Sequence, residues 1–195
     1  MGDVTGDGVD LVMVGDHRQA TYKTNNAARN SAYAGAKIVD RFREWEKAGR
    51  LTVSYARETH RCHQLIANFA DSFYPTEPST ISKNTTVTGH DGVFLVSAKA
   101  VPDYIAVFAP QVLRLDRKTN CDGYPAQNFG ETKGMTFDRV LIYPHGKGKT
   151  WLTTGGYQHV QPSAAKLYVG VSRARHSVAF VLDGISSVPG LVRYA

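Results

Sequence analysis

The side chains best suited to chemistry in this sequence include a glutamine in a short polar turn. Gln19 follows an apolar run over residues 9–14, which we expect to form a buried strand that ends at Gly15 and Asp16. Open α/β sheets bind ligands at the carboxyl ends of their strands. A glutamine in that position can hydrogen-bond a terminal phosphate or the water that attacks it. The alternative is a polar turn between a strand and a helix, with Asp16 as the helix cap.

Arg61 is the second candidate. It lies near the start of a helix that we expect over residues 58–74. A cation at a helix N-terminus opposes the helix dipole, so a negatively charged partner explains Arg61 better than the helix does. The alternative is a surface arginine paired with Glu58.

Two further arginines, Arg173 and Arg175, close a helix that we expect over residues 163–173. Positive side chains suit the C-terminal end of a helix dipole, so a capping role is one interpretation. Guanidinium groups also bind phosphate through paired N–H donors. Two arginines at the start of the final strand would then form a forked phosphate clamp.

A glycine-containing stretch precedes the strand expected over residues 139–143. Gly130 and Gly134 allow the backbone to approach a ligand closely, and Lys133 between them can contact a phosphate. The stretch is therefore a further candidate for phosphate binding.

A second basic stretch, GKGKT over residues 146–150, follows the same strand but departs from a nucleotide-binding loop. The pattern G-x-x-x-x-G-K-[ST] requires glycine where this chain has Tyr143. Residues 151–156 form helices poorly, so we expect residues 145–156 to be a loop without a helix N-terminus to hold phosphate. The favoured interpretation is a flexible basic loop that touches a phosphate backbone.

Two stretches hold metal-ligand side chains without completing a site. Residues 3–8 resemble the start of a calcium loop, but its twelfth position, which requires an acidic ligand, is Val14. The HRCH stretch over residues 60–63 lacks the ligands of a structural zinc, because the only other cysteine, Cys121, falls in an unrelated loop. No metal site is predicted.

The expected elements alternate between strand and helix. Further strands are expected over residues 51–55, 93–96, 112–115 and 176–182, and further helices over residues 25–49 and 101–108. Residues 76–90 are polar and are expected to form a loop. The strands are nearly continuous in apolar residues, which is typical of a parallel sheet covered by helices on both faces. The sequence therefore predicts an α/β fold.

Composition indicates the class of protein, its possible partners and its location. The chain has 195 residues, 42% of them hydrophobic, and a formal net charge of +6, which is ordinary for a globular domain and allows a nucleic-acid partner. No apolar stretch approaches the ~20 residues of a membrane helix, so no membrane partner is expected. With only two cysteines, disulfides do not stabilise the fold, and a reducing, cytoplasmic location is expected.

Four of these stretches, taken in order, resemble the later motifs of UvrD/Rep-like superfamily 1 DNA helicases. Residues 14–22 (VGDHRQATY) resemble motif III, V-G-D-x-x-Q-x-I-Y. Residues 59–62 (THRC) are similar to motif IV, the Y-R-S stretch. Residues 132–140 (TKGMTFDRV) resemble motif V, A-K-G-L-E-F-x-x-V, and residues 167–175 (LYVGVSRAR) resemble motif VI, L-Y-V-A-L-T-R-A-R.

The resemblance implies a RecA-like three-layer domain with a mainly parallel sheet. Residues 51–195 would form the second RecA-like domain of a helicase motor. Residues 1–50 would be the C-terminal remnant of the first domain, a strand followed by a linker helix. In this family ATP lies between the two domains, and the first domain supplies the phosphate loop and the magnesium-binding acids.

Site residues follow from the matching motif positions. By this resemblance Gln19 senses the γ-phosphate of ATP, and Arg61 and Arg173 clamp it as catalytic side chains. The remaining implied contacts are Gly134 and Thr136 to ATP, and Tyr22, Glu131 and Lys133 to single-stranded DNA.

The chain departs from the family pattern in ways that bear on activity. It contains neither a Walker A loop nor a D-E-x-Q-D stretch, and Thr136 stands where motif V has glutamate. We therefore expect the C-terminal motor half of an ATP-dependent DNA helicase, whose partner is the N-terminal RecA-like domain of its parent. ATP and Mg²⁺ would bind the parent, and this chain alone would bind neither and be inactive. The alternative is a non-catalytic nucleic-acid- or protein-binding module derived from a helicase domain.

Overall fold

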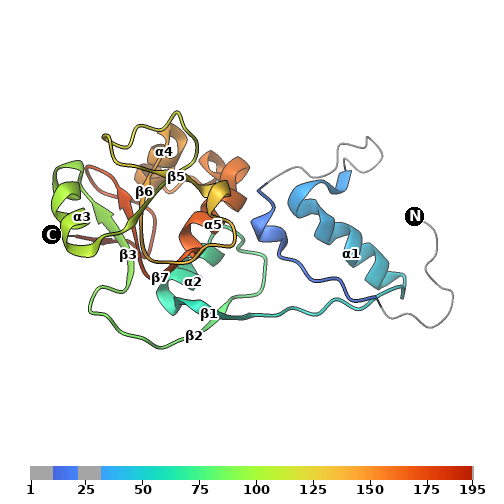
Figure 1. The fold of residues 1–195 in the computed structure, drawn as a ribbon. Helices are drawn as coiled ribbons and strands as arrows, with labels where there is room; N and C mark the ends of the chain where they lie inside the picture. The colour runs from blue at the N-terminus through green and yellow to red at the C-terminus, as the bar shows by residue number, and fades with distance from the viewer. Residues whose placement is uncertain (1–10, 22–31, 195) are drawn as a thin grey trace.

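The computed structural model describes residues 11–21 and 32–194 (Figure 1). Its main body is built on a six-stranded sheet with the strand order β5-β4-β6-β7-β3-β8. Every neighbouring pair in this main sheet is parallel. The strands are β3 (Gly92–Val96), β4 (Gln111–Arg114), β5 (Gln127–Asn128), β6 (Phe137–Tyr143), β7 (Ala174–Val181) and β8 (Val192–Arg193).

Helices cover the two faces of the main sheet. Along β6, Val140 and Ile142 belong to one apolar cluster and Leu141 to another, because successive side chains of a strand point to opposite faces. The first cluster includes residues of α2 (Gln64–Asp71), α4 (Gly146–Thr154) and α5 (Ala164–Ser172). The second includes Tyr104 of α3 (Val101–Phe108). The predicted α/β fold, a RecA-like three-layer arrangement with a mainly parallel sheet, is confirmed.

Several predicted elements are confirmed within a residue or two. The helix over 101–108 is α3, and the strands over 93–96 and 112–115 are β3 and β4. The helix over 163–173 is α5, and the last two predicted strands are β6 and β7. Short 3-10 helices complete the chain at η1 (His17–Gln19), η3 (Gly35–Lys37), η4 (Ala98–Ala100), η5 (Phe129–Thr132), η6 (Tyr157–His159) and η7 (Gln161–Ser163).

The long helix predicted over 58–74 is wrong in its first part. Residues Glu58–His63 form the strand β1, which pairs in parallel with β2 (Ile81–Asn84) inside the segment predicted to be a loop. Side chains of β2 hold the backbone of β1, since Asn84 Nδ2 donates to the Arg61 carbonyl at 2.7 Å and Ser82 Oγ donates to the Cys62 carbonyl at 2.7 Å. The helix α2 begins only at Gln64.

The glycine-rich loop predicted over 145–156 is also wrong, because most of it is the nine-residue helix α4. Its composition disfavours a helix, yet Trp151 and Leu152 are buried in the core, and burial outweighs weak propensity. Gly155 ends the helix in the left-handed conformation (φ 72°), where its amide donates to the Trp151 carbonyl at 2.8 Å.

The N-terminal elements differ most from prediction. Of the strand predicted over 9–14, residues 11–14 are described; they form no strand and are exposed, Val14 to 95%. An apolar run stays a strand only when a neighbouring strand satisfies its backbone, and no described residue pairs with it. The strand predicted over 51–55 is likewise absent. The helix predicted over 25–49 is confirmed only as α1 (Ile38–Lys47), which buries no residue and stands apart from the main sheet (Figure 1).

Candidate functional site

Four of the predicted residues come together at the amino edge of the main sheet, the side where its parallel strands begin. Arg173 is the last residue before β7, and Thr136 is the last residue before β6. Arg61 reaches this edge from β1 and Gln19 from η1. We call the group Gln19, Arg61, Thr136 and Arg173 the arginine site.

Arg173 is the buried centre of the arginine site, with 2% of its surface exposed. Its Nη2 donates to Gln19 Oε1 at 3.2 Å, and its Nη1 donates to the Met135 carbonyl at 3.4 Å. Its Nε has no hydrogen-bond partner, and no carboxylate of the described residues forms an ion pair with it. A buried cation without a counter-charge among the described residues is costly.

Arg61 adds a second positive charge to the same place. Its Nε donates to Thr136 Oγ1 at 3.1 Å and its Nη1 to the Ser172 carbonyl at 3.1 Å. Burial, together with the charge of Arg61, lowers the pKa of Arg173 to about 10, so Arg173 is still charged at neutral pH. The prediction that Arg61 opens a helix is wrong, because Arg61 lies in the strand β1. The alternative pairing with Glu58 is not observed either, since Glu58 pairs with Lys83.

Gln19 is held with its amide oxygen toward Arg173. Its Nε2 donates to Asp16 Oδ2 at 2.8 Å, which leaves Oε1 to accept from Arg173. Asp16 also caps η1 by accepting from the Arg18 amide at 3.0 Å. Asp16 thus caps the 3-10 helix η1, as the alternative interpretation proposed, and Gln19 also contacts Arg173.

Arg18, which the sequence did not single out, fastens this turn to the main body. Its Nε donates to Asp16 at 3.1 Å and its Nη1 to Asp71 of α2 at 3.3 Å. Its guanidinium lies over the Tyr168 ring of α5, 4.8 Å from the ring centroid. A charged residue in a polar turn is normally solvated, so only its position beside Gln19 could have indicated this role.

The residues of the predicted motif V divide between two roles. Lys133 Nζ donates to the Gln19 carbonyl at 3.4 Å, which links this stretch to the turn that carries Gln19. Gly134 has φ 91°, a conformation that favours glycine, and lies between Lys133 and the site. Glu131 points elsewhere, because its carboxylate accepts from the backbone and side chain of Asn128, both at 2.9 Å.

One other candidate, Arg175, does not join the arginine site. Arg175 donates to Asp138 at 2.7 Å in an exposed ion pair, so the predicted fork of Arg173 and Arg175 is wrong and Arg61 takes the second place. Tyr22 and the stretch resembling a calcium loop lie outside the described residues.

Among the described residues, no three His, Cys, Asp or Glu side chains gather as metal ligands. The described helices include none that is long and apolar enough to cross a bilayer.

Fold and site together define a three-layer α/β domain with two arginines and a glutamine at the amino edge of its sheet, and neither arginine pairs with a carboxylate of the described residues. Among solved structures, the chain is similar to PRRSV helicase, with 16% identity and a TM-score of 0.43 over 73% of this chain and 27% of that one. It is similar to an arterivirus nonstructural protein 10 (helicase) in complex with DNA, with 19% identity and a TM-score of 0.41 over 65% of this chain and 25% of that one. The chain spans about a quarter of the length of these helicases. No family model and no curated protein matches it.

Proposed function

We propose that this chain is the second RecA-like half of an ATP-dependent, UvrD/Rep-like superfamily 1 DNA helicase or translocase. Arg61 and Arg173 would contact the γ-phosphate of an ATP held by an N-terminal RecA-like domain, and Gln19 would sense it. The same proposal includes that N-terminal domain, of which residues 1–50 would be the remnant. It also includes a domain boundary near residue 51 and a cytoplasmic location.

The observation that carries the proposal is the state of Arg173. It is buried beside Arg61 and lacks a carboxylate partner among the described residues, so an incoming phosphate would provide the missing counter-charge. Arginines placed in this way stabilise the charge that develops in phosphoryl transfer, and an arginine finger contributes ~10³–10⁵-fold to the rate.

The side chains of this chain suit a phosphate of ATP better than they suit Mg²⁺. Two guanidinium groups and an amide suit the oxygen atoms of a terminal phosphate. The described residues gather no set of acidic ligands, so the N-terminal domain would supply the magnesium-binding acids and the phosphate loop. This chain alone would not hydrolyse ATP.

DNA binding belongs to the same proposal through Lys133. Its ammonium is exposed and donates to the carbonyl of Gln19, so a shift of Gln19 on hydrolysis would move a cation that contacts single-stranded DNA. Tyr22 would stack on a base, which contributes ~1–3 kcal/mol. Glu131 would take part only after leaving its hydrogen bonds to Asn128.

The test is Arg173→Ala in the parent protein, with Arg175→Ala as the matched control. Hydrolysis should fall by at least ~10³-fold in Arg173→Ala while ATP affinity changes little, because the finger acts on the transition state. Arg175 pairs with Asp138 on the surface, so its variant should keep normal turnover. Unchanged turnover in Arg173→Ala would reject the assignment.

The alternative is a non-catalytic module that binds nucleic acid or protein. The observation in its favour is that the anion-facing groups are present while a phosphate loop is absent from the chain. A preceding segment of the parent with G-x-x-x-x-G-K-[ST] and D-E-x-Q-D favours the motor, and a parent without them favours the module.

A further inference from the structure

A hollow at the opposite, carboxyl edge of the main sheet is not used by the proposed function. It lies where β6 ends, at Tyr143 and Pro144. The seven residues of β6 span about 20 Å at ~3.3 Å per residue, so the hollow and the arginine site are well separated. The carboxyl ends of parallel strands are also where open α/β sheets bind ligands.

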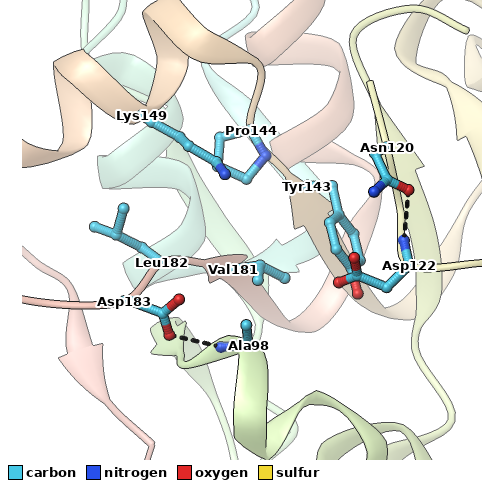
Figure 2. Close-up of a pocket in the computed structure, with 9 residues that line it drawn as sticks. All are labelled: Ala98, Asn120, Asp122, Tyr143, Pro144, Lys149, Val181, Leu182 and Asp183. Atoms are coloured by element: carbon cyan, nitrogen blue, oxygen red, sulfur yellow. Dashed lines mark hydrogen bonds between the residues drawn. The ribbon is translucent and has the colours of Figure 1, made fainter. Parts of the chain in front are cut away.

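The hollow has two adjoining parts that share Asn120, Pro144 and Lys149. One part, about 390 Å³, lies between the connection from β4 to β5 and the start of α4. The other part, about 300 Å³, reaches Asp183 beyond β7 and Ala98 beyond β3 (Figure 2). Each volume falls within the ~300–1,000 Å³ of small-molecule sites. We call the two parts together the α4 hollow.

The start of α4 offers free backbone donors to this hollow. Its N-cap, His145, makes no side-chain capping hydrogen bond. The first helical bond runs from the Lys149 amide to the His145 carbonyl at 2.9 Å, so the amides of residues 146–148 have no partner in the helix. Gly148 is packed so tightly that an added Cβ would lie 3.1 Å from His145 Nδ1. Such a terminus attracts an anion.

The charges of this first turn are opposite to those that a helix dipole prefers. The turn contains no acidic residue and carries Lys147 and Lys149. Lys149 lines both parts of the hollow, and Lys118 approaches from the connection that follows β4. Lys147 lines neither part. An anion in the hollow would offset the charge of Lys149 and Lys118.

Tyr143 provides an independent sign of a missing ligand. It is 5% exposed, and its hydroxyl has no hydrogen-bond partner among the described residues. Figure 2 shows its ring at the hollow with Asp122 nearby. Burial raises the pKa of Tyr143, and the charge and close approach of the Asp122 carboxylate raise it further, so the hydroxyl keeps its proton and can donate to Asp122 or to a ligand.

Three carboxylates limit where an anion can lie. Asp116 accepts from the Lys118 amide at 3.0 Å on the α4 side. Asp183 accepts from the Ala98 amide at 2.9 Å on the far side, where Asp122 also lines the wall. The acidic far side would repel a phosphate but can accept hydrogen bonds from hydroxyl groups.

We propose that the α4 hollow binds a sugar phosphate. The phosphate would lie at the N-terminus of α4 beside Lys149, and the sugar hydroxyls would lie toward Tyr143 and Asp122. The ligand is either a free nucleotide or part of a nucleic-acid strand. The site is distinct from the arginine site and does not depend on the helicase proposal.

The test is a titration of the 195-residue chain with ribose 5-phosphate, followed by the backbone amide resonances of residues 146–148. Those resonances should shift, and Lys149→Gln should weaken binding by about 10-fold because a charge-assisted hydrogen bond is lost. Tyr143→Phe should weaken it by about 5-fold. The matched control is Lys147→Gln, which removes the same charge from the same turn and should change affinity by less than about 2-fold.

Equal losses in Lys147→Gln and Lys149→Gln would mean only diffuse attraction and would overturn the proposal. Amides 146–148 that do not move would overturn it as well. Adenosine monophosphate and a short oligothymidylate then distinguish the sources. The one that shifts the same amides and displaces ribose 5-phosphate identifies the ligand, and failure of both would reject the site.

Discussion

The two edges of the main sheet hold their positive charges in different ways. At the amino edge, Arg61 and Arg173 come from distant segments and are fixed by hydrogen bonds to Thr136, Met135 and Gln19. At the carboxyl edge, the lysines of α4 belong to one turn and extend into solvent. The first arrangement suits an anion that must be positioned closely, and the second suits one that enters and leaves easily.

The largest expected effect tests whether α4 is built into the core. Leu152 is fully buried, so Leu152→Ala should lower the free energy of unfolding by about 3 kcal/mol. Urea denaturation followed by fluorescence measures it. A flexible loop over 145–156 would give a change close to zero, and the carboxyl edge would then lack a helix terminus.

The next effect concerns the ion pairs by which Arg18 holds the turn that carries Gln19 against α2. Arg18 contacts both Asp16 and Asp71, and all three side chains are largely buried. Arg18→Ala leaves Asp71 without this cation and should cost about 2 kcal/mol, again by urea denaturation. Arg175→Ala breaks an exposed pair and should cost less than about 1 kcal/mol. Equal costs would show that Arg18 is an ordinary surface residue.

The buried charge of Arg173 should lower the free energy of unfolding of the domain. Arg173→Met replaces a buried cation that has no carboxylate partner among the described residues with an apolar chain of similar length, and it should stabilise the fold by about 1 kcal/mol. Thermal unfolding with and without pyrophosphate provides the readout. Pyrophosphate should raise the Tm of the wild type more than that of the variant, which keeps only the α4 hollow as a phosphate site. A variant less stable than the wild type would contradict this view of Arg173.

The smallest effect is a change in histidine titration. Burial lowers the pKa of His145, at the carboxyl edge between Asp116 and Lys147, and of His90, near Arg139 and Asp91 at the amino end of β3. The fold therefore favours the neutral ring, and stability should fall as pH drops below ~6.5. Bound ribose 5-phosphate should raise the pKa of His145 alone, since a nearby anion favours the charged ring. NMR titration that moves both rings equally would contradict separate sites.

Sequence reasoning succeeded where local pattern and tertiary structure agree. The helix α3 could be predicted because its apolar spacing and Pro102 in the first turn indicate the same helix. The helix α4 could not, since its residues favour a loop and only the burial of Trp151 and Leu152 forms it. The strand β1 was missed because its pairing with β2 is a contact distant in sequence.

The candidate site was predictable in its members and not in its geometry. Motif positions named Gln19, Arg61 and Arg173, yet no spacing along the chain places a strand, a 3-10 helix and a helix end together. Arg18 was missed because its partners Asp71 and Tyr168 come from two separate helices.

The outermost strands of the main sheet, β5 and β8, contain two residues each. A growing fibril needs a long, straight border of unpaired peptide groups onto which the next molecule can add, and this border is too short to supply it. The main sheet is thus protected from edge-to-edge polymerisation even at the concentrations that the titrations above require.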